Sequence, residues 1–139
     1  VRTARLLAVT LARRAGVPEP LLDEVRLAVG EACGRAVRVH LHSGIGDPIT
    51  LLLIDDDGFE AVVIDVASDA GPARDAVAQR PARAAVAQRP DGARDAAAVG
   101  LAILGAVVDD VTIEPVLPRG TSVRMRWPAE AAGAAAPAS

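Results

Sequence analysis

Two apolar segments that flank an Asp-rich turn constrain the fold more than any other feature of this 139-residue chain. Residues 49–54 and 59–67 are rich in β-branched and aliphatic side chains, which favours β-strands. The turn between them, residues 55–58, ends in Asp-Gly, a strong local signal for a β-hairpin. Because an apolar hairpin must pack one face on another layer, the rest of the chain must supply helices to cover it.

Helical patterns on both sides of the hairpin provide that layer. Residues 1–15, 21–40 and 96–108 carry apolar side chains at three- and four-residue spacing, which predicts amphipathic helices. The first helix has its apolar positions at Leu6, Leu7, Val9 and Leu11. The stripe predicted to be buried in the second helix is Leu22, Val25, Val29, Ala32 and Ala36.

A second pair of strands is predicted over residues 111–116 and 121–127. The resulting order is helix, helix, strand, strand, variable segment, helix, strand, strand. It predicts an α+β, two-layer sandwich with helices on one face of a mostly antiparallel sheet. We expect one domain over residues 1–128 and a disordered, low-complexity tail over residues 129–139.

The variable segment contains a tandem duplication. Residues 73–81 are repeated as residues 82–90 with one change, Asp75 to Ala84. The period is too short for a solenoid repeat, so we interpret the duplication as slippage in a permissive loop.

Composition excludes several classes of function. A net charge of −3 and an aromatic fraction of 1% argue against nucleic-acid partners, which need basic surfaces or stacking platforms. No apolar run is long enough to span a membrane, so we expect a soluble, cytoplasmic protein. A single cysteine, Cys33, excludes a disulfide framework, and we expect it to be a small buried residue. We expect His40 and His42 to be polar residues at the start of a loop, and no metal site.

Three short motifs contain residues that could bind a ligand or take part in catalysis, although each has a simpler structural interpretation. Glu31 and Arg35 are four residues apart on a helix, which alone predicts an exposed salt bridge. Asp69 and Gly71 follow a strand, where a carboxylate can accept hydrogen bonds from an amino group but can equally form a turn. Gly100 is placed near the start of the third helix, where free backbone N–H groups can bind phosphate.

Taken in order, the motifs resemble those of the anti-sigma factor serine/threonine kinase family, within the Bergerat-fold (GHKL) ATPases. That family has Glu-Ala-x-x-Asn on a helix, Asp-x-Gly-x-Gly after a strand, a lid, Gly-x-Gly-Leu before a helix, and Gly-Thr opening the last strand. The matching segments here are residues 27–32, 69–71, 100–103 and 120–123. The resemblance spans residues 4–127, implies the histidine kinase-like ATPase fold, and makes residues 73–95 a lid-like segment.

The resemblance assigns roles to individual residues. It makes Glu31 the general base that removes the proton of a partner's serine hydroxyl. It makes Asp69 the residue that reads adenine, with Gly71 allowing close approach of the base. The other nucleotide-binding positions that it implies are Arg35, Gly100, Leu101, Gly120 and Thr121.

The chain departs from the family pattern where Mg²⁺ is held. Arg35 occupies the position of the family's asparagine, and arginine cannot be a metal ligand because its nitrogens carry protons and positive charge. Arg35 either replaces Mg²⁺ as the charge facing the phosphates, or pairs with Glu31 or Asp69 and fills an emptied pocket. We expect the second, hence weak or absent ATP binding and no use of Mg²⁺.

The resemblance leaves three functions open. The first is an anti-sigma factor-like regulator of transcription that binds a sigma factor and a STAS-domain anti-sigma antagonist. The second is an active serine kinase that phosphorylates that antagonist. The third is a stand-alone ATP-binding or sensory domain. The resemblance also implies a homodimer.

Overall fold

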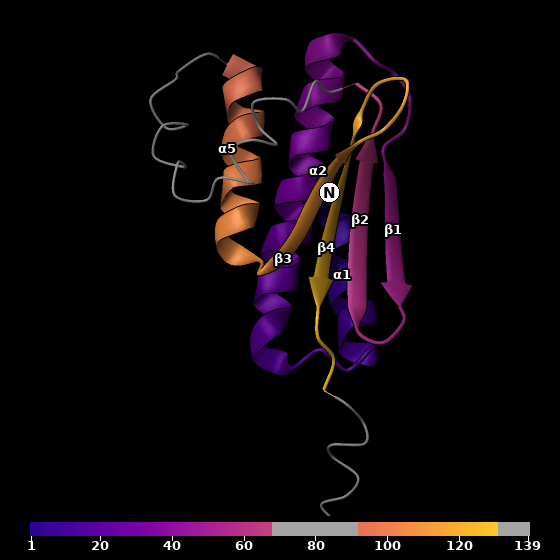
Figure 1. Cartoon of the computed structure of the whole chain (residues 1–139), viewed down its shortest axis with the longest axis vertical. Helices are drawn as coiled ribbons and strands as arrows, with labels where there is room; N and C mark the ends of the chain where they lie inside the picture. Colours follow the sequence, from indigo (N-terminus) through magenta and orange to yellow (C-terminus); the bar gives the residue numbers. More distant parts are fainter. Residues whose placement is uncertain (68–91, 131–139) are drawn as a thin grey trace, which may run out of the picture.

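Four strands form one antiparallel sheet in the computed structural model, which describes residues 1–67 and 92–130. The strands are β1 (Thr50–Asp55), β2 (Phe59–Asp65), β3 (Asp110–Pro115) and β4 (Thr121–Trp127). Their order is β1-β2-β4-β3, so β2 and β4 are central and β1 and β3 are edges. The helices lie together on one face of the sheet (Figure 1), which confirms the α+β two-layer sandwich.

The hairpin that was predicted from sequence joins β1 to β2. Asp57 and Gly58 both have positive φ, 52° and 121°, the conformation that an Asp-Gly hairpin turn requires. The inward-facing residues of β2 alternate with outward-facing ones and are all buried: Phe59, Ala61, Val63 and Asp65. An acidic residue therefore occupies the last inward position of a strand that is otherwise apolar on that side.

The covering layer contains α1 (Arg2–Arg14), a 3₁₀ turn η1 (Glu19–Leu21), α2 (Leu22–Ser43) and α5 (Gly92–Val107). α2 is longer than predicted and ends at Gly44, whose φ of 66° allows its N–H to bond to helical carbonyls. α5 begins at Gly92 rather than at residue 96. Within the described ranges, no helix is long and apolar enough to cross a membrane.

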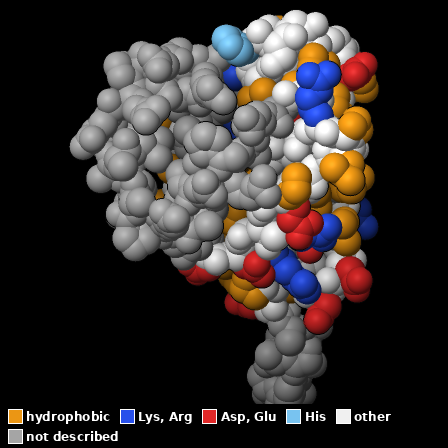
Figure 2. Space-filling view, turned by 45° about the horizontal axis from the view of Figure 1, so that its top comes forward, with side chains coloured by type: hydrophobic (Ala, Val, Ile, Leu, Met, Phe, Trp, Pro, Cys, Tyr) orange, Lys and Arg blue, Asp and Glu red, His pale blue; other side chains and the backbone are white. Residues whose placement is uncertain are grey.

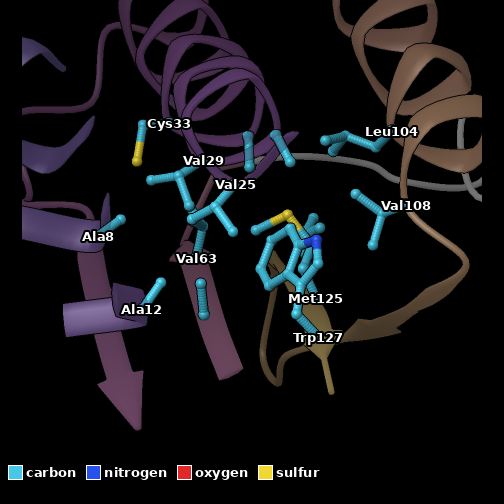
Figure 3. Close-up of a cluster of buried hydrophobic side chains, with 14 of the residues drawn as sticks. Ala8, Ala12, Val25, Val29, Cys33, Val63, Leu104, Val108, Met125 and Trp127 are labelled. Atoms are coloured by element: carbon cyan, nitrogen blue, oxygen red, sulfur yellow. The ribbon is translucent and has the colours of Figure 1, made fainter. Parts of the chain in front are cut away.

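The core lies between α2 and the two central strands (Figure 3). All five residues of the predicted stripe on α2 are buried, whereas Leu6 and Leu7 of α1 are 61% and 51% exposed. The prediction for α1 was therefore wrong in these two positions. Its core face consists of Ala8, Val9 and Ala12, because small side chains allow the helix to approach the sheet closely.

Several sequence predictions fall outside the described residues. These are Asp69 and Gly71, the duplication over residues 73–90, and the tail from residue 131 onward. The expected lid over residues 73–95 lies outside them except for its last residues, which belong to α5.

Candidate functional site

A buried ion pair joins the centre of α2 to the end of β2. Arg35 Nη1 donates a hydrogen bond to Asp65 Oδ2 at 2.7 Å, and the two side chains are 1% and 0% exposed. Asp65 Oδ1 also accepts the N–H of Ala67 at 3.2 Å. Of the two partners expected for Arg35, Glu31 is not bonded to it, and Asp69 lies outside the described residues. Asp65 is one of the alternating inward-facing residues of β2, so this carboxylate, rather than Glu31, lies beneath the helix.

The pair is tightly enclosed but not fully satisfied on the arginine side. Arg35 Nε is buried and has no hydrogen-bond partner. Removing one member of a buried pair leaves a charge without compensation, which costs far more than the net stability the pair provides. Arg35 and Asp65 are therefore expected to hold one another in place rather than to exchange partners.

Gly100 lies in the middle of α5, where it faces α2. The prediction that it sits near a helix start is wrong, because α5 begins eight residues earlier at Gly92 and the N–H of Gly100 belongs to the helix interior. A methyl group placed on Gly100 would lie 3.2 Å from Arg38 Nη2 and 3.6 Å from Glu31 Oε2. The glycine therefore permits α5 to close over charged side chains of α2.

Glu31 and Arg38 are the charged side chains of α2 beside Gly100 of α5, and we call the contact between the two helices at these residues the α2–α5 groove. Glu31 is partly buried, and within the part of the chain that the structure describes it makes no hydrogen bond or ion pair. Arg38 reaches back along its own helix, with Nη1 3.3 Å from the position of a methyl group on Gly34. Its Nε is buried without a hydrogen-bond partner. The groove thus keeps a carboxylate available, as a general base requires.

Gly120 and Thr121 pack against the buried pair from β4. Thr121 is fully buried and lies opposite Asp65 in the β2–β4 register. Gly120 has a φ of 135°, and a methyl group there would lie only 2.2 Å from the backbone oxygen of Asp65. Leu101, by contrast, is 0% exposed and belongs to the core.

His40 forms a second tether at the end of β2. It is 4% exposed, so the prediction of a polar residue at a loop start is wrong. Its Nε2 accepts the N–H of Val66 at 3.1 Å, and its Nδ1 lies 3.0 Å from the carbonyl oxygen of Asp47. Because Nε2 is an acceptor, the proton belongs on Nδ1, which donates to that carbonyl. His42 is exposed in the last turn of α2.

Cys33 lies between Glu31 and Arg35 in sequence but faces the core. It is 6% exposed, which confirms the prediction of a small buried residue. Burial raises the pKa of the Cys33 thiol, so little thiolate forms near neutral pH. Cys33 is therefore not suited to act as a nucleophile beside Glu31.

An arginine, which cannot ligate a metal, stands at the position that the family resemblance assigns to Mg²⁺ binding. Arg35 stands at the position where the family resemblance requires an asparagine ligand, and it is committed to Asp65. Within residues 1–67 and 92–130, no group of three or more His, Cys, Asp or Glu side chains could hold a metal.

Sequence reasoning missed Asp65, His40 and Arg38. The inward position of Asp65 could have been predicted, because Asp65 continues the alternation of inward-facing residues along β2. The roles of His40 and Arg38 carried none, because they depend on how α2 meets β2 and α5 in three dimensions.

The comparison with family models agrees with the fold. The model described as the histidine kinase-like ATPase domain matches residues 1–127. No curated protein matches the chain. The matched range contains every described helix and strand, together with Glu31, Arg35, Gly120 and Thr121. The chain therefore belongs to the family of histidine kinase-like ATPase domains, in the GHKL superfamily.

Proposed function

We propose that this domain is an anti-sigma factor-like regulator of transcription that acts by binding proteins and has a degenerate ATP site. The observation that supports a degenerate site is the 2.7 Å ion pair between Arg35 and Asp65. It occupies the position at which the family's asparagine holds Mg²⁺. Such a regulator acts in the cytoplasm, where it binds a sigma factor and a STAS-domain antagonist.

The energetics of the pair favour weak nucleotide binding. To admit Mg²⁺, Arg35 must move away, which breaks its 2.7 Å ion pair with the fully buried Asp65 carboxylate. Breaking that pair costs several kcal/mol. This cost is subtracted from the interaction energy between Mg-ATP and the protein, so the affinity for Mg-ATP falls.

Calorimetry with Mg-ATP tests the state of the site. We expect no binding tighter than about 1 mM, and a micromolar dissociation constant would overturn the degenerate-site proposal. The double variant Arg35→Asn, Asp65→Asn provides an amide ligand without leaving a buried carboxylate. It is expected to bind Mg-ATP more tightly than the natural chain. If its affinity does not improve, Arg35 is not the cause of weak binding.

Binding measurements with purified partners test the regulatory role. A sigma factor and a STAS-domain antagonist are each mixed with the chain in the absence and presence of Mg-ATP. Binding to either protein that does not depend on nucleotide supports the proposal. Recovery of neither partner overturns it and favours a stand-alone ATP-binding or sensory domain.

An active serine kinase is the second candidate, and the state of Glu31 favours it. Glu31 is partly exposed and unpaired among the described residues, as a general base that must accept a proton should be. A phosphotransfer assay with radiolabelled ATP and the antagonist separates the two functions. Labelling that disappears in Glu31→Gln supports the kinase, and no labelling supports a regulator that acts by binding.

A further inference from the structure

Helix α2 has a second stripe of apolar residues, on the side that faces away from the sheet. Its members recur at alternating steps of three and four residues, and we call them the outer seam: Leu27, Gly30, Gly34, Val37 and Leu41. This spacing is that of a coiled-coil seam, along which a second helix packs. The three aliphatic members are 47%, 36% and 76% exposed, so the outer seam is not part of the core. An apolar stripe that a helix turns to solvent is typical of a docking surface.

The two glycines of the outer seam leave the helix backbone open to side chains from either flank. A methyl group on Gly30 would lie 3.0 Å from Arg5 Nη2, and one on Gly34 would lie 3.3 Å from Arg38 Nη1. Arg5 belongs to α1, which packs on one side of α2, and Arg38 reaches toward α5, which packs on the other side (Figure 1). The outer seam therefore has an arginine on each flank.

These two arginines give the outer seam a positive border. Within residues 1–67 and 92–130, neither guanidinium makes a hydrogen bond or an ion pair. Helix α1 contains four arginines and no acidic residue. On α2, Asp23 already pairs with Arg26 at 3.4 Å, and Glu31 lies toward α5. In a helix pair, residues beside the seam bind opposite charges on the partner helix, so the complement of this surface is acidic.

The outer face of the sheet lacks this pattern. Figure 2 views the molecule from the sheet side and shows hydrophobic, basic and acidic side chains intermixed. Arg124 of β4, for example, forms an ion pair with Glu60 of β2 on that face. Charges that are neutralised within a face do not select the charge of a partner, whereas those beside the outer seam do.

We propose that the outer seam binds an acidic amphipathic helix of a partner protein, an inference that rests on the proposed function of a regulator that acts by binding proteins. Leu27, Val37 and Leu41 contact the apolar side chains of that helix, and the two glycines allow it to approach closely. Arg5 and Arg38 pair with carboxylates on its two flanks. A membrane surface fits less well, because interfacial helices bury bulky aromatic and aliphatic side chains, and two of the five seam positions are glycine.

Binding of a purified sigma factor and a purified STAS-domain antagonist tests the surface with a matched pair of variants. Leu27→Asp and Leu52→Asp introduce the same charge at leucines that are 47% and 44% exposed, on the helical side and the sheet side respectively. Leu27→Asp is expected to weaken partner binding about tenfold or more, whereas Leu52→Asp leaves it unchanged. Urea denaturation checks that both variants are folded.

The outcomes separate this inference from the proposed function. A partner that binds both variants equally overturns the docking surface and leaves the regulatory function standing. A chain that binds neither protein overturns the regulatory function, and binding of synthetic peptides then decides whether the outer seam selects an acidic helix.

Two synthetic helical peptides test the chemistry of the occupant. Both have leucine at the seam positions a and d, and the flanking positions e and g are glutamate in one and lysine in the other. The natural chain is expected to bind the acidic peptide with a dissociation constant below about 100 µM, at least about tenfold tighter than the basic one. Arg5→Gln should weaken this binding, and Arg119→Gln, an exposed arginine in the turn between β3 and β4, should not. No binding of the acidic peptide at about 1 mM, or equal affinity for both peptides, overturns the proposal.

Two other occupants of the outer seam are distinguished with the same variant. Binding of anionic phospholipid vesicles that Leu27→Asp abolishes, without peptide binding, would assign the seam to a membrane surface. Self-association of the chain that Leu27→Asp abolishes would assign it to a second copy. Either result overturns the proposal of an acidic partner helix.

Discussion

Arg35 and Glu31 lie one turn apart on α2, but their surroundings are opposites. Arg35 points into the layer between α2 and β2, where it is 1% exposed and bonded to Asp65. Glu31 points into the groove between α2 and α5, where it is partly exposed and unpaired among the described residues. In the family pattern these two positions serve one nucleotide. Here the first position is held by an arginine bonded to Asp65, whereas the carboxylate at the second position is partly exposed.

The difference predicts that the two regions respond differently to substitution. The buried contacts around Asp65 behave as part of the core, since Gly120, Thr121 and His40 all pack at the same end of β2. The groove around Gly100 contains Glu31 and Arg38, two partly exposed side chains of opposite charge. Substitutions in the buried contacts should therefore change stability, and substitutions in the groove should change function alone.

The largest expected effect follows from removing Arg35. Arg35→Ala removes a fully buried cation that is bonded to Asp65, so we expect a loss of about 3–5 kcal/mol in the free energy of unfolding. Urea denaturation measures it. Arg13→Ala is the matched control, because Arg13 and Glu19 form a 2.9 Å ion pair on the surface. It should have little effect. A small loss for Arg35→Ala would mean that water reaches Asp65.

Replacing both members of the buried pair tests whether the loss of stability in Arg35→Ala comes from the carboxylate that remains. Arg35→Met with Asp65→Leu removes two buried charges together, and such replacements are often neutral or stabilising. The double variant should recover most of the stability lost by Arg35→Ala. A double variant as unstable as the single one would show that the cost comes from packing rather than from the unpaired carboxylate.

Gly120 is expected to have the next largest effect. Gly120→Ala forces a φ of 135° on a residue with a side chain and brings its methyl group within 2.2 Å of the Asp65 backbone oxygen. We expect a loss of about 3 kcal/mol, measured by thermal or urea unfolding. Gly46→Ala, which meets nothing within 4 Å, is the control and should be nearly neutral. Equal stability of the two variants would mean that β4 shifts freely at its start.

Substitution of His40 is expected to reduce stability less than substitution of Arg35 or Gly120. His40→Leu leaves the Val66 N–H and the Asp47 carbonyl oxygen without their partner, which predicts a loss of about 2 kcal/mol. Hydrogen exchange of the Val66 amide should be faster in this variant, because the amide loses its acceptor, His40 Nε2. His42→Leu changes an exposed histidine of the same helix and should leave both measurements unchanged. Unchanged exchange in His40→Leu would contradict the tether.

The sequence predicted the layers of the fold well and the site only in part. The hairpin, the α2 stripe and the β3–β4 pair followed from periodicity and turn chemistry, which are local properties. The partner of Arg35 depends on which face of β2 lies under α2. The alternation of residues along β2 predicts an inward position for Asp65. No local sequence pattern predicts that this position lies beneath Arg35. Pro90 and Asp91 carry a helix-start signal just before α5, but residues up to 95 were assigned to the lid-like segment, so the predicted start came too late.

Glu31→Gln gives the smallest expected change in stability and the clearest test of the groove. Because Glu31 is unpaired among the described residues, its substitution should shift the free energy of unfolding by no more than about 0.5 kcal/mol. Gly100→Ala is a complementary change, since its methyl group meets only the flexible end of Arg38 closer than 3.4 Å. If Glu31→Gln alters partner binding or phosphotransfer while stability stays constant, the groove carries function and the buried pair carries structure. A loss of stability as large as that of His40→Leu would mean that the groove also belongs to the structural core, and the contrast between the two regions would no longer stand.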